Sequence, residues 1–269
     1  MKQILWIAIA SFVFRLGAHA QAYDGKLDYQ KTQQPVAIIE LSYSQDVVED
    51  GIKDYMVKRG YKNSSAKGFT VYRSAKLDSN DTDLSDLYFK IERKGRKEKD
   101  VTVITLVPTR PNQDILALSG DSTTAARIDK AKSFLNQLAP SLDAHNTDVQ
   151  FAAQQEVLKK SQKKLLNLQN DQTDLEKKIR KINADQDQNK SDILKQTQDI
   201  QTTVTSDADV KNKMQKKLNK LLDQQDDLRK KLRKSQADLD ENRINQDAQQ
   251  KDVDKQQQAL DAIRAKQKS

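Results

Sequence analysis

The sequence predicts an α+β protein in two parts. The first is a small domain with an antiparallel sheet and the element order β-α-β-β-β-(β)-α, and the second is a long antiparallel coiled-coil helical hairpin. Two observations lead to this prediction. Up to about residue 140, short β-branched stretches alternate with turn residues. From residue 147 onward Gly, Pro, Tyr and Trp are absent, and Leu and Ile recur at heptad spacing.

Residues 1–20, MKQILWIAIASFVFRLGAHA, have the pattern of a secretory signal peptide. A lysine precedes an apolar run at 4–14, and Ala18-His19-Ala20 supplies the small residues of a cleavage site. The apolar run is shorter than the roughly 20 residues that span a bilayer as a helix. We therefore expect cleavage before Gln21, a secreted or periplasmic protein, and no transmembrane anchor after cleavage.

The composition argues against most catalytic and metal chemistry. The sequence contains no cysteine, and after cleavage His145 is the only histidine. Thiol nucleophiles, disulfides and histidine-rich zinc sites are therefore excluded, and we expect no enzyme activity and no cofactor. The net charge of +8 lies mainly in the tail and is interleaved with acidic residues, so it does not indicate a nucleic-acid-binding protein.

The expected domain covers residues 35–140 and follows a polar N-terminal arm at 21–34. After Pro35, the β-branched stretch 36–43 predicts a strand. The next apolar residues recur at helical spacing between Ser44, a candidate N-cap, and Gly60, a candidate stop. The strand is therefore followed by a helix.

The rest of the domain is expected to be mainly strands. Alternating apolar residues predict strands at 68–77, 86–94 and 100–109, the last two forming a hairpin, with a short fifth strand at 114–120. A helix follows over 121–140. This order predicts a mostly antiparallel sheet with helices on one face.

Residues 141–146 are expected to form a linker to the coiled-coil hairpin at 147–269, where an unbroken heptad frame runs to Ile200 and a second frame begins at Met214. The predicted coiled-coil core consists of Leu158, Leu165, Leu175, Ile179, Ile182, Ile193, Ile200, Met214, Leu218, Leu221, Leu228, Leu232 and Leu239.

The break between the two frames predicts a turn near residues 204–209. Threonine and valine at 202–205 disfavour helix, and Ser206-x-x-Asp209 has the form of a new helix start. A fold-back centred on Asp207 pairs apolar layers and aligns two polar pairs, Asn189 with Gln225 and Gln172 with Asn242. The spacing also fits the alternative, a four-residue stutter in one continuous rod.

Two segments of the domain are candidate binding sites. The turn at 93–99 is the densest positive patch and is a candidate contact for anionic lipid head groups or envelope polymer. The stretch DSNDTDLSD at 78–86 resembles a calcium loop but lacks the glycine and glutamate of an EF-hand, so an ordinary connection is favoured. The candidate anion-contact residues are Arg93, Lys94, Arg96, Lys97 and Lys99.

Together these features predict a non-enzymatic protein for protein interaction or envelope assembly, with a chaperone-like or scaffolding role. The expected partner is another protein, or a second copy, bound through the coil. Two alternatives remain: a carboxylate-dependent hydrolase of cell-wall glycan, whose chemistry needs no histidine, and a binder of anionic envelope polymer through residues 93–99.

Overall fold

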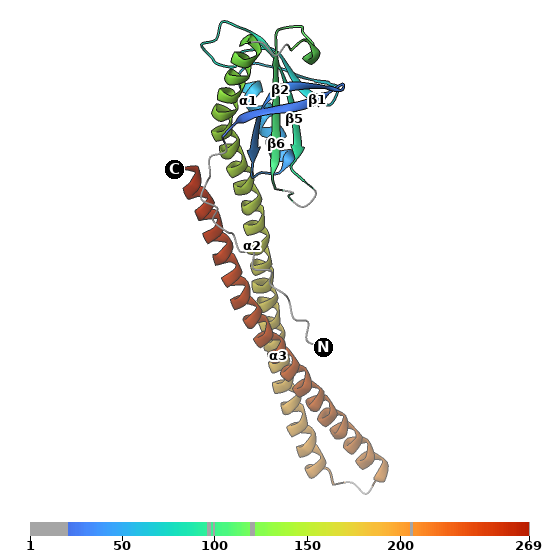
Figure 1. Ribbon diagram of the computed structural model, residues 1–269. Coiled ribbons are helices and arrows are strands. Elements are labelled where there is room, and N and C mark those ends of the chain that lie inside the picture. Colours follow the sequence, from blue (N-terminus) through green and yellow to red (C-terminus); the bar gives the residue numbers. More distant parts are fainter. Residues whose placement is uncertain (1–20, 96–97, 99, 119–121, 205–206, 269) are drawn as a thin grey trace. The chain divides into compact units, whose positions relative to one another are not determined.

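A computed structural model describes residues 21–95, 98, 100–118, 122–204 and 207–268 (Figure 1). The expected signal peptide lies outside these residues. The chain divides into two compact units, Met1–Gln150 and Phe151–Ser269. Within the described residues, no helix combines the length and the apolar character needed to cross a membrane.

The first unit contains a six-stranded sheet in the order β1-β2-β6-β5-β4-β3, with every neighbouring pair antiparallel. The predicted antiparallel sheet is therefore confirmed, and so is the helix after the first predicted strand, which is α1 (Gln45–Lys58). The strands are β1 (Tyr23–Tyr29), β2 (Thr32–Leu41), β3 (Asn63–Ala66), β4 (Phe69–Ala75), β5 (Ser85–Arg93) and β6 (Thr102–Thr109).

Both edge strands were missed because they carry few buried apolar side chains. Residues 21–34, expected as a polar arm, form β1 and the start of β2, and no residue of β1 is fully buried. The turn between them has positive φ at Gln30 (50°) and Lys31 (67°), the backbone of a tight hairpin that is usually built with Asn-Gly. Without those turn residues the hairpin gives no clear sequence signal.

The predicted fifth strand is instead a 3₁₀ turn, η1 (Ile115–Ala117). The Asp114 carboxylate accepts a hydrogen bond from the Leu116 backbone N–H at 3.3 Å and so caps this turn. Ile115 is buried, whereas Leu116 is 43% exposed. The apolar run DILAL therefore packs against the core through Ile115 and, partly, Leu118, and does not pair as a strand.

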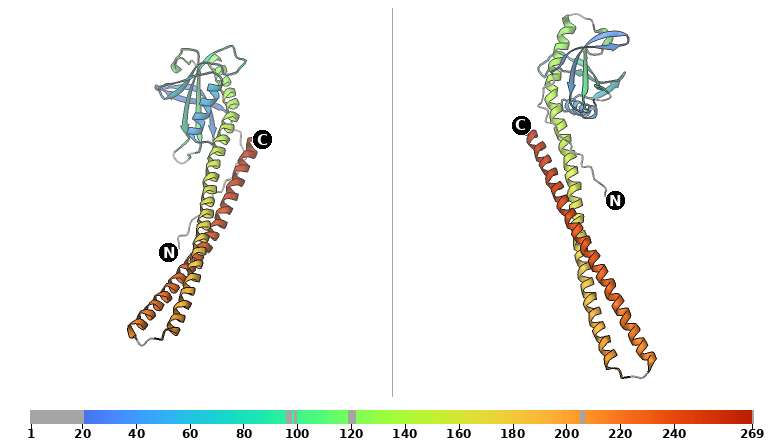
Figure 2. Two further views of the ribbon diagram at one scale, coloured as in Figure 1. Left: turned by 180° about the vertical axis from the view of Figure 1, so that it is seen from behind. Right: turned by 60° about the horizontal axis from the view of Figure 1, so that its bottom comes forward.

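The sheet has an apolar cluster on each face. The larger cluster joins the sheet to α1 and to the first part of α2 (Ser122–Thr202), through Ile128, Phe134, Leu135 and Leu138 among others. The smaller one joins Val36, Phe69, Val71, Tyr88 and Val107 to Ile115 of η1. Figure 2 shows both helices against the sheet from two sides. The helix-covered face is as predicted, and η1 supplies a partial cover for the other.

Helix α2 continues through Pro140, so the expected linker at 141–146 is helical. Proline removes one backbone hydrogen bond and normally kinks or ends a helix. Here the next turn is held by packing, since Leu142 is 2% exposed and belongs to the larger cluster. Gly51 of α1 makes room for it: a Cβ at Gly51 would lie 2.7 Å from Leu142 Cδ2.

The second unit is a helical hairpin of the rest of α2 and α3 (Ala208–Gln267), which confirms the predicted hairpin and makes the continuous rod wrong (Figure 1). Thr203 closes α2 by donating its hydroxyl to the Asp199 carbonyl at 2.6 Å. Asp207 starts α3 by accepting from the backbone N–H groups of Asp209 (2.9 Å) and Val210 (3.4 Å). Ser206, the expected cap, lies outside the described residues.

Pro140→Ala tests the continuity of α2. We expect it to stabilise the domain by about 2 kcal/mol, because alanine restores a helical N–H and removes the ring clash. Thermal unfolding followed by near-ultraviolet circular dichroism of the tyrosines, all of which lie between residues 23 and 88, measures the domain alone. Pro111→Ala, in the turn after β6, is the matched control and is expected to give no gain, because a turn proline restricts the unfolded chain. Equal effects of the two substitutions would contradict an unbroken helix.

Candidate functional site

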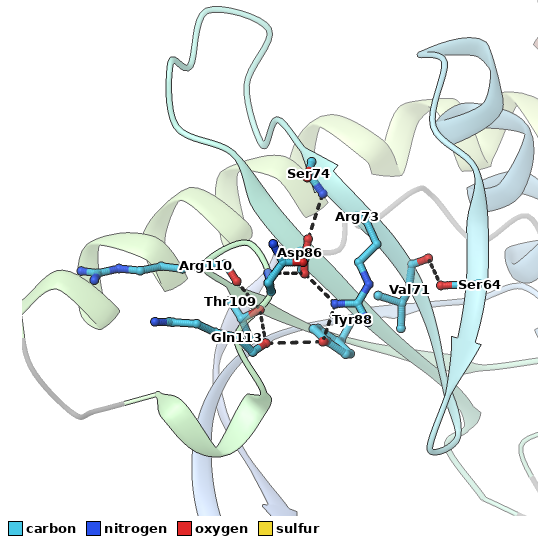
Figure 3. Close-up of polar contacts among 10 residues, drawn as sticks. Ser64, Val71, Arg73, Ser74, Asp86, Tyr88, Thr109, Arg110 and Gln113 are labelled. Carbon is cyan, nitrogen blue, oxygen red and sulfur yellow. Dashed lines mark hydrogen bonds and ion pairs between the residues drawn. The ribbon is translucent and has the colours of Figure 1, made fainter.

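The most connected polar group of the domain is the buried carboxylate of Asp86 on β5 (Figure 3). Its side chain is 1% exposed and accepts three hydrogen bonds. Arg73 Nη1 donates at 2.6 Å, and the backbone N–H groups of Ser74 and Asn112 donate at 2.8 and 3.0 Å. Ser74 and Asn112 both have positive φ, 49° and 63°. Asp86 therefore holds two strained backbone sites, the bulge in β4 and the turn after β6.

The surroundings of Asp86 indicate a structural role. Burial alone would raise the pKa of Asp86, but the hydrogen bonds from Ser74, Arg73 and Asn112 outweigh it and hold the pKa below its usual range. Arg73 also lies over the Tyr88 ring, 5.6 Å from its centroid, and donates to the Tyr88 hydroxyl at 3.2 Å. A carboxylate bonded on both oxygens and kept ionised is a poor general acid.

The candidate anion contact lies at the turn between β5 and β6, and only part of it is described. Arg93 and Lys94 are exposed, while Arg96, Lys97 and Lys99 lie outside the described residues. Lys94 Nζ lies 2.7 Å from Glu40 Oε2. The hydrogen bond from Lys94 also lowers the pKa of Glu40. Lys94 is therefore already paired with a carboxylate of β2.

The Asp-rich segment 78–86 spreads its carboxylates over separate partners. Asp78 accepts from the backbone N–H of Asn80 at 3.0 Å, and Asp81 pairs with Lys130 at 2.6 Å. Asp86 is buried and bonded by Arg73, Ser74 and Asn112. Within the described part of the chain, no group of three or more His, Asp or Glu side chains is arranged to hold a metal ion.

The hairpin places every position of the predicted coiled-coil core at least partly inside. Leu158, Ile182 and Leu239 are buried, and the other predicted core positions are half-buried. Leucines and isoleucines outside the heptad frames lie outside the seam: Leu166 is 55%, Leu194 70% and Ile244 68% exposed. The heptad frames therefore separate inward from outward apolar side chains correctly.

Hydrogen bonds across the seam alternate with these apolar layers. Side-chain amides of Gln154, Asn189, Gln196, Gln246 and Gln249 donate to backbone carbonyls of the facing helix over 3.1–3.3 Å. At one layer Ser161 also bonds both Gln249 and Asp252. Such bonds can form only in one register, so they fix the alignment of the arms.

The observed register is close to the one expected from the sequence. Asn189 donates to the carbonyl of Leu221, one helical turn from its expected partner Gln225. Gln172 accepts from Gln246 at 2.7 Å, and Gln246 also bonds Asn242, the expected partner of Gln172. Glutamines at core heptad positions were the sequence signal for this polar seam. The predicted core contained only Leu, Ile and Met214, and only two polar pairs were used to set the register.

No protein-family model, no curated protein and no solved structure matches the chain.

Asp86→Asn tests the hub, by which we mean Asp86 with its three donors Arg73, Ser74 and Asn112. We expect a loss of about 2 kcal/mol in the free energy of unfolding, because the amide cannot serve all three donors. The pKa of Asp86 is lower in the folded than in the unfolded protein. Its contribution is therefore full above the unfolded pKa of about 3.9 and disappears as the pH falls through the folded value. Tyrosine circular dichroism between neutral and acid pH measures both effects.

Asp83→Asn is the control for Asp86→Asn, since Asp83 lies in the same segment and is exposed. It is expected to change neither the unfolding midpoint nor the acid dependence appreciably. If both variants unfold alike at neutral pH, Asp86 does not hold the two loops.

Proposed function

We propose that this chain is an exported, non-enzymatic protein that binds another protein through its helical hairpin, in a chaperone-like or scaffolding role. The observation that carries the proposal is the incomplete burial of the hairpin core. After the two helices have packed, core positions such as Leu165, Leu175 and Ile193 are still partly exposed. An apolar stripe in that state gains free energy when a further surface covers it.

Outward-facing apolar side chains support the same proposal. Leu166 and Leu194 on α2, and Leu222 and Ile244 on α3, are exposed between 43% and 70%. Single exposed apolar residues are common on soluble proteins and prove little alone. On a two-helix hairpin whose seam is rich in glutamine, they add contact area that the hairpin itself does not use.

Export rests on the sequence of residues 1–20, with a short apolar run and a small-residue cleavage site. The absence of cysteine suits an oxidising compartment, because no thiol is present to form an unwanted disulfide. The mature chain is expected to begin at Gln21.

The two alternatives are less well supported. Glycan hydrolysis requires a carboxylic acid and a second carboxyl about 5–10 Å away across a cleft. Asp86, the buried carboxylate of the domain, is instead ionised and bonded by three donors. Binding of an anionic polymer at 93–99 has in its favour the exposure of Arg93 and Lys94, but Lys94 is paired with Glu40.

Site-specific photocrosslinking in the cells that make the protein tests the proposal. Benzoylphenylalanine replaces Leu166 or Ile244 on the hairpin, and Val57 of α1, which is 54% exposed, is the matched apolar position on the domain. We expect a discrete protein adduct from the hairpin positions and none from Val57. Adducts only at Val57, or none at the hairpin positions, would contradict binding through the hairpin.

A further inference from the structure

Two depressions follow each other along one side of the hairpin, between α2 and α3. The one nearer the turn has a volume of about 360 Å³ and contains Asp185, Asp192 and Asp227 with Lys231. The other has a volume of about 510 Å³ and contains Asp171, Asp174, Asp238 and Glu241 with Lys178. We call the two together the acidic groove. Its carboxylates outnumber its lysines although the whole chain carries a net charge of +8.

The two depressions are lined from positions that are related by a shift of two heptads on both helices. Asp171 and Asp174 correspond to Asp185 and Gln188 on α2, and Asn242 corresponds to Leu228 on α3. Two heptads of α-helix rise about 21 Å. At this interval a third α-helix lying in the groove would meet one carboxylate of α2, Asp171 or Asp185, and one of α3, Glu241 or Asp227. The other positions differ, since Lys178 stands where the depression nearer the turn has Asp192.

A buried asparagine explains why each depression exists. Asn189 in one and Asn242 in the other occupy core positions where a leucine would fill the space between the helices. Both are less than a tenth exposed. Each asparagine faces an apolar neighbour in its depression, Leu228 or Leu175, so the floor of the groove is part apolar and part amide.

Asn189 also has an unused acceptor. Its Nδ2 donates to the Leu221 carbonyl at 3.1 Å, which fixes the orientation of the amide. Its Oδ1 is buried and has no hydrogen-bond partner. A buried acceptor without a partner costs about 1–3 kcal/mol, so Asn189 is a less stable core residue than the leucine that would fill the same position.

Most of the carboxylates in the groove are available for a cation. Asp174 and Asp227 pair with Lys177 and Lys230, one turn along their own helix, at 3.1 and 3.8 Å. In the described structure the other groove carboxylates, Asp171, Asp185, Asp192, Asp238 and Glu241, form no ion pair. No three carboxylates of the described residues are close enough together to hold a metal ion, so the spacing fits separate cationic side chains better.

We propose that the acidic groove binds a basic amphipathic α-helix of a partner protein. This proposal rests on the proposed function and names the side of the hairpin and the chemistry of the partner. The apolar face of the bound helix covers Leu175 and Leu228, and its arginines, two heptads apart, meet the carboxylates of the two depressions in turn. The assembly is a three-helix coil.

The probe is a synthetic helical peptide of about four heptads, with leucines along one face and arginines beside them. A second peptide with glutamate at each arginine position is the charge control. Binding to the full mature chain is measured by fluorescence anisotropy at low and high salt. We expect the arginine peptide to bind with an affinity that falls with salt, and the glutamate peptide not to bind.

Matched variants of the protein locate the site. Asp185→Asn, Asp192→Asn and Asp238→Asn together remove three groove charges and are expected to weaken binding of the arginine peptide at least about tenfold. Asp226→Asn, Asp240→Asn and Asp261→Asn together remove the same charge outside the groove, at exposed positions each paired with an arginine of its own helix. This control set is expected to change binding by less than about twofold, since screening by salt limits distant charges.

Asn189→Leu provides a test that leaves the charges in place. Leucine fills the depression, so we expect weaker peptide binding with unchanged helical circular dichroism. Equal loss from the groove set and the control set, or full binding by Asn189→Leu, would overturn the groove as the site. Self-association of the chain that is lost in the groove set would assign the groove to a second copy and equally overturn the proposal.

The two proposals fail separately. Photoadducts at Leu166 or Ile244 that persist unchanged in the groove set leave the hairpin as the binding part and refute the acidic groove. The absence of any adduct at those positions refutes the proposed function itself.

Discussion

The structure depends on the burial of apolar side chains along helix α2. Over its first turns α2 completes the larger core cluster of the domain with Ile128, Phe134, Leu138 and Leu142, all nearly inaccessible. Farther along the same helix, the apolar side chains follow the heptad period and contact α3 instead. Without α2 the sheet would expose one apolar face, and α3 would have no partner. Pro140 lies between these two uses and is tolerated because Leu142 packs in the next turn.

In the hairpin, the apolar layers hold the two arms together and the polar layers align them. A two-stranded coil covers each core side chain on one side only, so leucines there gain less from burial than leucines under a sheet. The amide-to-carbonyl bonds of Gln154, Gln196, Gln246 and Gln249 add little net stability each, but a shifted register would leave the amides and carbonyls unpaired. The arms are therefore aligned by hydrogen bonds and held together by a modest apolar seam.

The sequence was sufficient for features with strong periodicity. Four strands and α1 have apolar residues at intervals of two or 3.6 that identify the type of element. The heptads of the tail fit both a hairpin and a rod, and the poor helix formers at 202–205 favoured the hairpin. The sequence was insufficient where burial is partial or the backbone is unusual. Strand β1 is polar because it lies at an edge. Its turn has Gln30 and Lys31 at positive φ, and neither residue type predicts this backbone conformation.

The same distinction applies to the candidate sites: those that follow a periodic pattern can be predicted from the sequence, and the others cannot. Heptad frames locate the core of the coil, because each frame fixes which leucines point inward. They do not reveal the hub at Asp86, since its three donors come from β4, the bulge of β4 and the turn after β6, and only the folded sheet brings these together. The acidic groove is likewise invisible in one helix alone, because each depression takes its carboxylates from both arms.

The charge of the groove is informative because it opposes the charge of the chain. A chain of net charge +8 attracts anionic partners at long range, and that attraction is largely screened beyond about 8 Å at physiological salt. At contact distance the local carboxylates decide which partner fits, and those of the groove reject an acidic helix while accepting a basic one. Because the chain as a whole repels a basic partner weakly, selectivity of the groove rests on short-range contacts, with the apolar floor supplying affinity and the carboxylates supplying orientation.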